Sequence, residues 1–263
     1  MKITIIGAGN MGCAIALGLA NGSIIKAQDI TCTDVSSNVL EKINAINPLI
    51  QTTTNNHEAI KKADMIVLAV KPWLIEKVVS GLVSDLNYKK QIIVSIAAGI
   101  TFEQLSGFLK NKNQPQPTLF RLIPNTAISV RSSMTFVAAQ NATQEQINLI
   151  LNLFDELGLT MLIEERLVTA GTALGSCGIA YAFRYIRAAM EGGIELGLYP
   201  SQAKEVILQT LKGAIDLLKA NGTHPEEEID KVTTPGGITI KGLNEMEHAG
   251  FTSSIIKGLK ASK

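Results

Sequence analysis

The sequence of 263 residues has few charged residues, few aromatics and no long hydrophobic run, and each shortage excludes a class of protein. Charged residues make up 18% of the chain and hydrophobic residues 46%, whereas a disordered chain has high charge and low hydrophobicity. The longest apolar runs, Met65–Val70 and Ile92–Ile100, are far shorter than the ~18 residues of a membrane-spanning helix. The first residues also lack the pattern of a signal peptide. We therefore expect the surplus apolar area to lie in a subunit interface.

Net charge and metal-binding residues are sparse as well. The 24 Lys and Arg residues nearly balance 23 Asp and Glu residues, so the chain lacks the basic field that nucleic acids or anionic membranes require. Three widely spaced cysteines, Cys13, Cys32 and Cys177, predict reduced thiols in a cytoplasmic protein rather than disulfides or metal ligands. The histidines are few and scattered, so we expect no metal site, and no nucleic-acid or membrane partner.

Short strand-like runs alternate with helix-like segments over the first two thirds of the chain. The expected strands are Lys2–Ile6, Ile30–Thr33, Met65–Val70, Ile92–Ile96, Leu119–Leu122, Met134–Ala138 and Thr160–Ile163. Continuously apolar runs among them are typical of strands buried on both faces of a parallel sheet. A capping box of Thr143 and Gln146 opens the helix between the last two strands. The pattern predicts an α/β, Rossmann-like doubly wound domain over residues 1–163.

No strand is expected after residue 163. The expected helices are Arg166–Leu198, Pro200–Ala220, Pro225–Lys231, Gly237–Ala249 and Ser253–Ala261. Proline at the start of the second helix and Asn221–Gly222 after it are typical helix boundaries. The sequence therefore predicts an all-helical domain over residues 164–263.

A glycine-rich segment follows the first expected strand. Gly7, Gly9 and Gly12, with Asn10 and Met11 between them, form a G-x-G-x-x-G motif immediately before a helix. Such glycines allow a tight turn, close approach of a pyrophosphate and helix–strand packing, and the helix N-terminus binds the phosphates. We interpret the motif as a nicotinamide-dinucleotide site; a glycine turn without a dinucleotide is the alternative.

Asp34 lies at the end of the second expected strand. In dinucleotide-binding domains, an acidic residue at this position accepts hydrogen bonds from the ribose of NADH. No arginine follows it to bind the 2′-phosphate of NADPH, although serines and Lys42 are nearby. The cofactor is thus predicted as NADPH or NADH. The alternative role for Asp34 is to cap the next helix.

Three further strand ends add candidates, because ligands of an open parallel sheet lie at the carboxyl ends of its strands. The residues expected to line the cofactor there are Ala69, Val70, Lys71, Pro72 and Ala97. Lys71 is interpreted either as a phosphate or ribose contact or as a solvated lysine. Asn125 is a candidate for orienting the substrate or the carboxamide, with a simple turn as the alternative.

The segment Val232–Thr239 contains Thr-Thr-Pro-Gly-Gly-Ile-Thr at the start of a helix. Free N–H groups and threonine hydroxyls at such a turn form a site for a carboxylate. A helix cap without a ligand is the alternative.

These motifs together resemble the pyrroline-5-carboxylate reductase family. GAGNMG, AVKP, SIAAG, R-x-x-PNT and VTTPGG-x-T-x-x-GL-x-x-ME occur in the order and approximate spacing of that family, and the resemblance covers residues 1–263. It implies NAD(P)H-dependent reduction of the cyclic imine 1-pyrroline-5-carboxylate to L-proline, and a homodimer formed by the C-terminal helices, with further assembly possible.

The resemblance also implies roles for residues. The nicotinamide is expected at the strand ends and the substrate on the Pro-Gly-Gly turn of the partner subunit. Thr234, Gly236 and Gly237 would hold the substrate carboxylate, and Thr239 would hydrogen-bond the ring nitrogen as the catalytic polariser or proton relay. Asn56 would contact the adenosine side of the cofactor.

One segment departs from the family pattern. Ser176 stands where the family has glycine and Ile179 where it has proline, and we expect Ile179 to make the helix more regular and to alter the pocket wall. Two alternatives follow: a reductase of another cyclic imino acid, such as pyrroline-2-carboxylate, or a catalytically silent dinucleotide-binding sensor.

Overall fold

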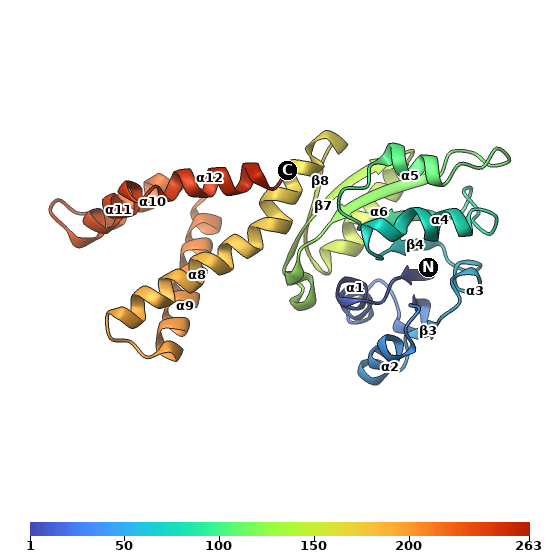
Figure 1. Cartoon of the computed structure of the whole chain (residues 1–263), viewed down its shortest axis with the longest axis horizontal. Coiled ribbons are helices and arrows are strands. Elements are labelled where there is room, and N and C mark those ends of the chain that lie inside the picture. Colours follow the sequence, from blue (N-terminus) through green and yellow to red (C-terminus); the bar gives the residue numbers. More distant parts are fainter. The chain divides into compact units, whose positions relative to one another are not determined.

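In the computed structural model, which describes residues 1–263, eight strands form one sheet (Figure 1). The strands are β1 (Ile3–Ile6), β2 (Ile30–Thr33), β3 (Gln51–Thr53), β4 (Met65–Leu68), β5 (Ile92–Ser95), β6 (Thr118–Ile123), β7 (Ser133–Gln140) and β8 (Gly158–Leu162). Their order is β3-β2-β1-β4-β5-β6-β7-β8, and only the β6–β7 pair is antiparallel. From β1 the strands are added in one direction to β3, and from β4 onward they are added on the other side of β1. The crevice at the carboxyl ends of β1, β2 and β4 is therefore the topological switch point, where sheets of this kind bind ligands.

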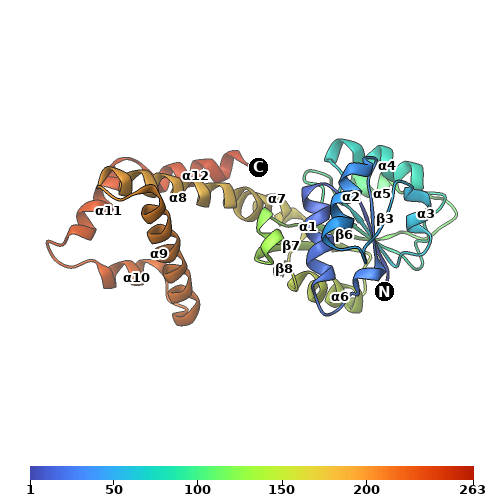
Figure 2. The ribbon, with the colours of Figure 1, turned by 90° about the horizontal axis from the view of Figure 1, so that it is seen from below.

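Helices cover both faces of this sheet (Figure 2). They are α1 (Asn10–Ala20), α2 (Ser37–Ile46), α3 (Asn56–Ile60), α4 (Ile75–Leu82), α5 (Phe102–Phe108) and α6 (Gln144–Asp155). One buried cluster joins the strands to α1, α2 and α6, and a second joins them to α3, α4 and α5. Because strand residues contribute to both clusters alternately, the central strands are buried on both faces, as their apolar runs predict. The predicted doubly wound α/β fold is confirmed.

Local signals set several helix boundaries. Thr143 caps α6 and forms the predicted capping box with Gln146. In the C-terminal region, Pro200 opens α9 (Pro200–Asn221), and Gly222 ends it with a φ of +64°. Gly250, with a φ of +82°, separates the two last helices. These glycines adopt the left-handed conformation that terminates helices.

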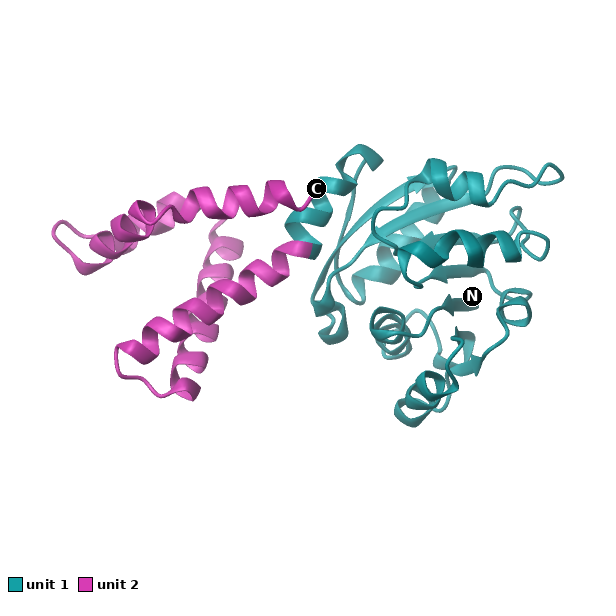
Figure 3. Cartoon of the chain, viewed as in Figure 1, with its two compact units in different colours: residues 1–176 teal, residues 177–263 magenta.

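The chain divides into unit 1, Met1–Ser176, and unit 2, Cys177–Lys263 (Figure 3). The sequence prediction placed the domain boundary after residue 163, where strand-like patterns stop just beyond β8. The segment that follows stays with unit 1 because Val168 and Ala173 are buried there. None of the helices in the chain is long and apolar enough to cross a membrane.

Unit 2 consists of helices with almost no core of their own. They are α8 (Gly178–Glu195), α9, α10 (Pro225–Val232), α11 (Ile238–His248) and α12 (Phe251–Ala261). Ala203 is the single buried residue of this unit, while large apolar side chains such as Phe183, Leu196 and Ile238 are 59%, 89% and 87% exposed. Exposed apolar area of this extent on one group of helices indicates an interaction surface.

The single regular helix expected over Arg166–Leu198 is wrong. The chain instead forms the 3-10 turn η4 (Glu165–Leu167), the short α7 (Val168–Gly171), a π-helical segment η5 (Thr172–Cys177) and then α8. A Cβ on Gly171 or Gly175 would lie 2.8 or 2.6 Å from the Phe136 ring, so this segment packs its glycines directly on that ring. The carbonyl of Gly175 also accepts a hydrogen bond from Asn125, which draws it out of the regular helix pattern.

Candidate active site

The glycine-rich segment lies between β1 and α1, at the carboxyl end of β1. Gly7 has a φ of +97°, and a Cβ there would lie 2.8 Å from backbone atoms of Ala69 and Val70. A Cβ on Gly12 would lie 1.9 Å from the carbonyl oxygen of Gly7. The fold itself therefore requires these two glycines, one for its backbone conformation and close approach to β4, the other for helix–strand packing.

Gly9 is different because nothing in the protein requires it. Its φ is −63°, which any residue adopts, and an added Cβ would meet no atom within 4 Å. No side chain caps α1, and its first turn has no acidic residue, so the N–H groups of Asn10 and Met11 remain available. An open cradle at an uncapped helix N-terminus fits a diphosphate. The residues present at this edge therefore fit a dinucleotide.

Asp34 lies beside this cradle and is fixed by two backbone hydrogen bonds. Its Oδ2 accepts from the N–H of Ala8 at 2.9 Å, and its Oδ1 accepts from the N–H of Ser36 at 3.0 Å. The N-cap residue of α2 is Ser36, so Asp34 supports the start of that helix without being its cap. A carboxylate has about four acceptor positions, so two remain for ribose hydroxyls.

Asn56 is the first residue of α3, next to the end of β2. Its Oδ1 accepts a hydrogen bond of 2.6 Å from the hydroxyl of Thr33, the last residue of β2. This contact orients the amide and leaves its Nδ2 free to donate to a ligand. Thr33 is not among the predicted site residues because a buried strand threonine carries no signal of this kind by itself.

The end of β4 continues the same edge. Ala69 donates its N–H to the carbonyl of Ile6 at 2.8 Å, which brings this end close to the glycine segment. Lys71 is exposed without an ion-pair partner, and Pro72 opens the 3-10 turn η2 (Pro72–Leu74). Trp73 in that turn is 76% exposed, which is unusual for tryptophan, and it too is not among the predicted site residues.

Ala97 and Asn125 follow β5 and β6. Ala97 is buried, and its N–H donates to the Ser95 hydroxyl at 3.3 Å, so this loop presents mainly backbone. Asn125 is also buried; its Oδ1 accepts from Ala127 N–H at 3.0 Å and its Nδ2 donates to the carbonyl of Gly175 at 3.2 Å. These bonds are those of a structural turn, and the predicted contact of Asn125 with substrate or carboxamide stays a prediction.

The second predicted site lies in unit 2, before α11. The N–H of Gly237 donates to the carbonyl of Thr234 at 2.9 Å, and Gly236 has a φ of +72°. Proline at the second position and a left-handed glycine at the third define a type II turn. A Cβ on Gly237 would lie 2.6 Å from the Thr234 hydroxyl, so glycine is required there too.

This turn leads into a helix that nothing in the chain caps. Gly237 is the N-cap of α11 and makes no side-chain cap bond, and the first turn of α11 has no acidic residue. Thr234 and Thr239 are exposed beside it. Free N–H groups, the positive end of the helix dipole and hydroxyls together suit a carboxylate.

Comparison with known proteins matches family models to both parts of the chain. Residues 165–263 match a family model described as pyrroline-5-carboxylate reductase dimerisation, and residues 2–99 match one described as NADP oxidoreductase coenzyme F420-dependent. Pyrroline-5-carboxylate reductase 2 of Dictyostelium discoideum is 35% identical over 280 residues, covering 99% of this chain and 90% of that protein. The chain belongs to the pyrroline-5-carboxylate reductase family.

Other members of the family agree over the whole chain. Pyrroline-5-carboxylate reductase 1 of the same organism is 36% identical over 272 residues; the chain is covered to 99% and spans about half, 48%, of that relative. The crystal structure of Plasmodium falciparum pyrroline carboxylate reductase with NADP bound superimposes with a TM-score of 0.89 at 25% identity, covering 100% of this chain and 95% of that one.

Family membership confirms the resemblance stated from the motifs and makes the chain an oxidoreductase with a Rossmann-type NAD(P)-binding domain. It also explains the exposed apolar faces of unit 2, because the dimerisation model covers these helices. The chain is therefore a subunit of a homo-oligomer.

Proposed function

We propose that this protein reduces 1-pyrroline-5-carboxylate to L-proline, with NADH or NADPH as the hydride donor. The observation that carries the proposal is the type II turn at Thr234–Gly237 with the uncapped helix α11 after it, because a dinucleotide-binding domain by itself does not need this turn. The reaction adds a hydride to the imine carbon and a proton to the ring nitrogen, and the cofactor leaves oxidised.

The residues of unit 1 would hold the cofactor. The N–H groups at the start of α1 and the open space over Gly9 suit its diphosphate, Asp34 its ribose, and Asn56 its adenosine side. The backbone at Ala97, small and without projecting side chains, suits the flat nicotinamide ring. When bound, the cofactor supplies the hydride; the protein contributes mainly binding and orientation.

The residues of unit 2 would hold the substrate. The N–H groups of Gly236 and of the first turn of α11, together with the Thr234 hydroxyl, suit the carboxylate of the imino acid, and Thr239 suits its ring nitrogen. Gly237 contributes the turn itself, because its own N–H donates to the Thr234 carbonyl. A cyclic imine is already partly protonated near neutral pH, so a strong acid is not needed. Thr239 then polarises the C=N bond or relays the proton.

The geometry of Asp34 favours NADH over NADPH. Because two backbone N–H groups hold its carboxylate, the negative charge stays at the end of β2, where a 2′-phosphate would meet it. Two basic side chains that follow Asn56 are engaged elsewhere: His57 pairs with Asp85 at 2.5 Å and Lys61 with Glu58 at 2.6 Å, whereas Lys42 on α2 has no ion-pair partner. A fixed carboxylate at the end of β2, with no arginine in the segment that follows it, disfavours a phosphate dianion.

A second candidate function is the reduction of another cyclic imino acid. The observation that favours it is η5, the π-helical segment that holds Ser176 and runs directly into α8, where Ile179 replaces the proline typical of the family. π-Helical segments of this kind occur frequently at functional sites. The sensor alternative differs from both, because it predicts cofactor binding without turnover.

One assay tests these functions. Purified protein is given NADH or NADPH with pyrroline-5-carboxylate, pyrroline-2-carboxylate or a six-membered cyclic imino acid, and loss of reduced-nicotinamide absorbance is followed. We expect the highest kcat/KM with NADH and pyrroline-5-carboxylate. A higher kcat/KM with another imine would establish the second candidate, and cofactor binding without any oxidation would establish the sensor.

The proposed function also includes an assembly state and a cellular location. A homodimer formed by the helices of unit 2 would bury their apolar faces, and a protein that stays monomeric at micromolar concentration would contradict it.

The cytoplasm stays the predicted location. In support, the three cysteines are unpaired, and burial raises the pKa of the Cys32 thiol to about 12, so this residue acts as a small apolar side chain.

A further inference from the structure

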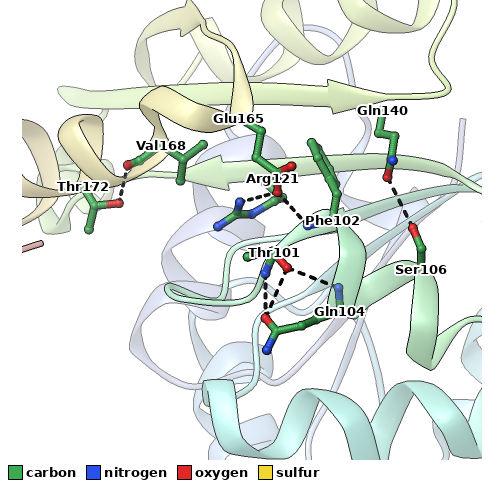
Figure 4. A network of polar contacts seen from close by, with 9 residues as sticks. All are labelled: Thr101, Phe102, Gln104, Ser106, Arg121, Gln140, Glu165, Val168 and Thr172. Atoms are coloured by element: carbon green, nitrogen blue, oxygen red, sulfur yellow. Dashed lines mark hydrogen bonds and ion pairs between the residues drawn. The ribbon is translucent and has the colours of Figure 1, made fainter.

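Arg121 is a buried cation in the middle of β6. Its side chain is 6% exposed, its Nε has no hydrogen-bond partner, and its guanidinium lies 5.8 Å from the centre of the Phe102 ring. A single anion neutralises it: its Nη1 donates to Oε1 of Glu165 at 2.7 Å (Figure 4). Since a buried charge is tolerated only when it is paired, Arg121 holds Glu165 in one place.

The same carboxylate oxygen accepts a second hydrogen bond. Oε1 of Glu165 also accepts a hydrogen bond of 2.7 Å from the backbone N–H of Phe102, the first residue of α5 (Figure 4). This N–H belongs to the first turn of a helix and has no partner within the helix. Thr101 and Gln104 form a capping box there, but these two residues move with α5 and do not tie it to the sheet. Glu165 does so.

The loop that precedes α5 has few other anchors. It runs from Ile96 to Thr101, and its middle contains the exposed residues Ala98 and Gly99, the latter with a φ of +81° and no atom within 4 Å of an added Cβ. Its start is fixed by the bonds from Ile96 N–H to the Leu68 carbonyl and from Ala97 N–H to the Ser95 hydroxyl. Its end is fixed through Glu165. This loop is also the one at which the nicotinamide is expected.

We propose that Glu165, held by Arg121, is a positioning residue that sets the nicotinamide-side loop Ile96–Thr101 for hydride transfer. The inference rests on the proposed function. Glu165 opens η4 and is the first residue of the region matched to the dimerisation model, so the same contact joins that loop to the start of the dimerisation region. Glu165 touches neither the diphosphate cradle nor Asp34, so its loss should affect turnover more than cofactor affinity.

The test compares Glu165→Ala with wild type and with a matched control. In Glu165→Ala we expect kcat with the preferred imine to fall by about 10- to 100-fold, because small displacements of reacting groups have effects of this size. The Kd for NADH should stay within about threefold, and the Phe102 amide should exchange its hydrogen faster. Glu164→Ala is the control, because Glu164 forms only an exposed pair with Arg166 and should behave as wild type.

Two further variants separate positioning from folding. Glu165→Gln keeps an oxygen that accepts both hydrogen bonds although Arg121 loses its counter-ion, so the stability should fall while the kcat of the folded protein recovers to within about threefold of wild type. If Glu165→Ala does not fold because Arg121 is left unpaired, the double variant Arg121→Met/Glu165→Ala removes that charge and should show the same low kcat and fast Phe102 exchange. Unchanged kcat or unchanged Phe102 exchange in the folded variant would overturn the inference. A wild type that oxidises neither cofactor with any imine would instead overturn the proposed function, and the exchange at Phe102 would then decide the inference alone.

Discussion

Replacing Asp34 by asparagine should reverse or abolish the preference for NADH. The substitution keeps the size of the side chain and removes its charge. In the structure the two carboxylate oxygens accept from the N–H groups of Ala8 and Ser36, at 2.9 and 3.0 Å. The amide oxygen retains one of these bonds, while the amide nitrogen faces the other N–H group and cannot accept from it.

The expected magnitude follows from two terms. A hydrogen bond from a ribose hydroxyl to a charged acceptor contributes about 1.5–3 kcal/mol, roughly twice a neutral one, so NADH should lose about fivefold to tenfold in kcat/KM. A 2′-phosphate carries about two negative charges, each repelled by about 1 kcal/mol from a carboxylate ~4 Å away in water, so NADPH should gain about 10- to 30-fold. Together the ratio of the two kcat/KM values should shift by about 100-fold.

The assay measures kcat/KM for both cofactors in the wild type and in Asp34→Asn at constant ionic strength. Asp29→Asn is a suitable control, because Asp29 lies at the opposite end of β2. The lost backbone bond should also lower the free energy of unfolding by about 1–3 kcal/mol, measured in urea. A wild type that prefers NADPH, or a ratio that Asp34→Asn leaves unchanged, would refute the reasoning.

Three other outcomes are expected. Gly9→Ala should keep the melting temperature, since an added Cβ meets no protein atom, while the Kd for NADH rises about tenfold or more; unchanged affinity would mean that no diphosphate lies there. Thr239→Ala should keep cofactor affinity and lose about tenfold in kcat, through one hydrogen bond to the ring nitrogen, and undiminished turnover would remove Thr239 from the mechanism. The bonds from Lys231, Thr223 and Asn221 lower the pKa of Glu228 to about 2, below its unfolded value near 4.5. The stability that Glu228 contributes is therefore full above pH ~4.5 and is lost as the pH falls toward 2, so urea unfolding of Glu228→Gln should depend less on pH in that window than wild type does.

Much of the fold could be predicted from local pattern. The expected strand Ile30–Thr33 is observed with the same bounds, and the capping box at Thr143 opens α6 as expected. β3 escaped prediction because its three residues are polar and lie at the sheet edge, where no apolar run is needed. The order of strands and the antiparallel β7 also required the structure, because strand pairing depends on residues distant in sequence.

The candidate site divides in the same way. The spacing of Gly7 and Gly12 predicted their places because Gly7 adopts a positive φ in the local turn and Gly12 lies against the carbonyl of Gly7, five residues before it; the close approach of Gly7 to Ala69 and Val70 appears only in the structure. Neither the bond from Ala8 to Asp34, 26 residues apart, nor the bond from Arg121 to Glu165, 44 residues apart, has a local signature. The irregular η5 was missed because the partners of its glycines and carbonyl, Phe136 and Asn125, lie elsewhere in the chain.

The sequence by itself determined what short-range chemistry encodes: strands buried on both faces, the glycine turn before α1, the Pro-Gly turn before α11 and the apolar faces of the C-terminal helices. Only the tertiary structure decided which charges are fixed and by what. A carboxylate such as that of Glu165 is identical in sequence to its neighbour Glu164, yet one is bound to a buried arginine and a helix N-terminus and the other lies in solvent. That difference depends on which residues the folded chain brings within hydrogen-bond distance.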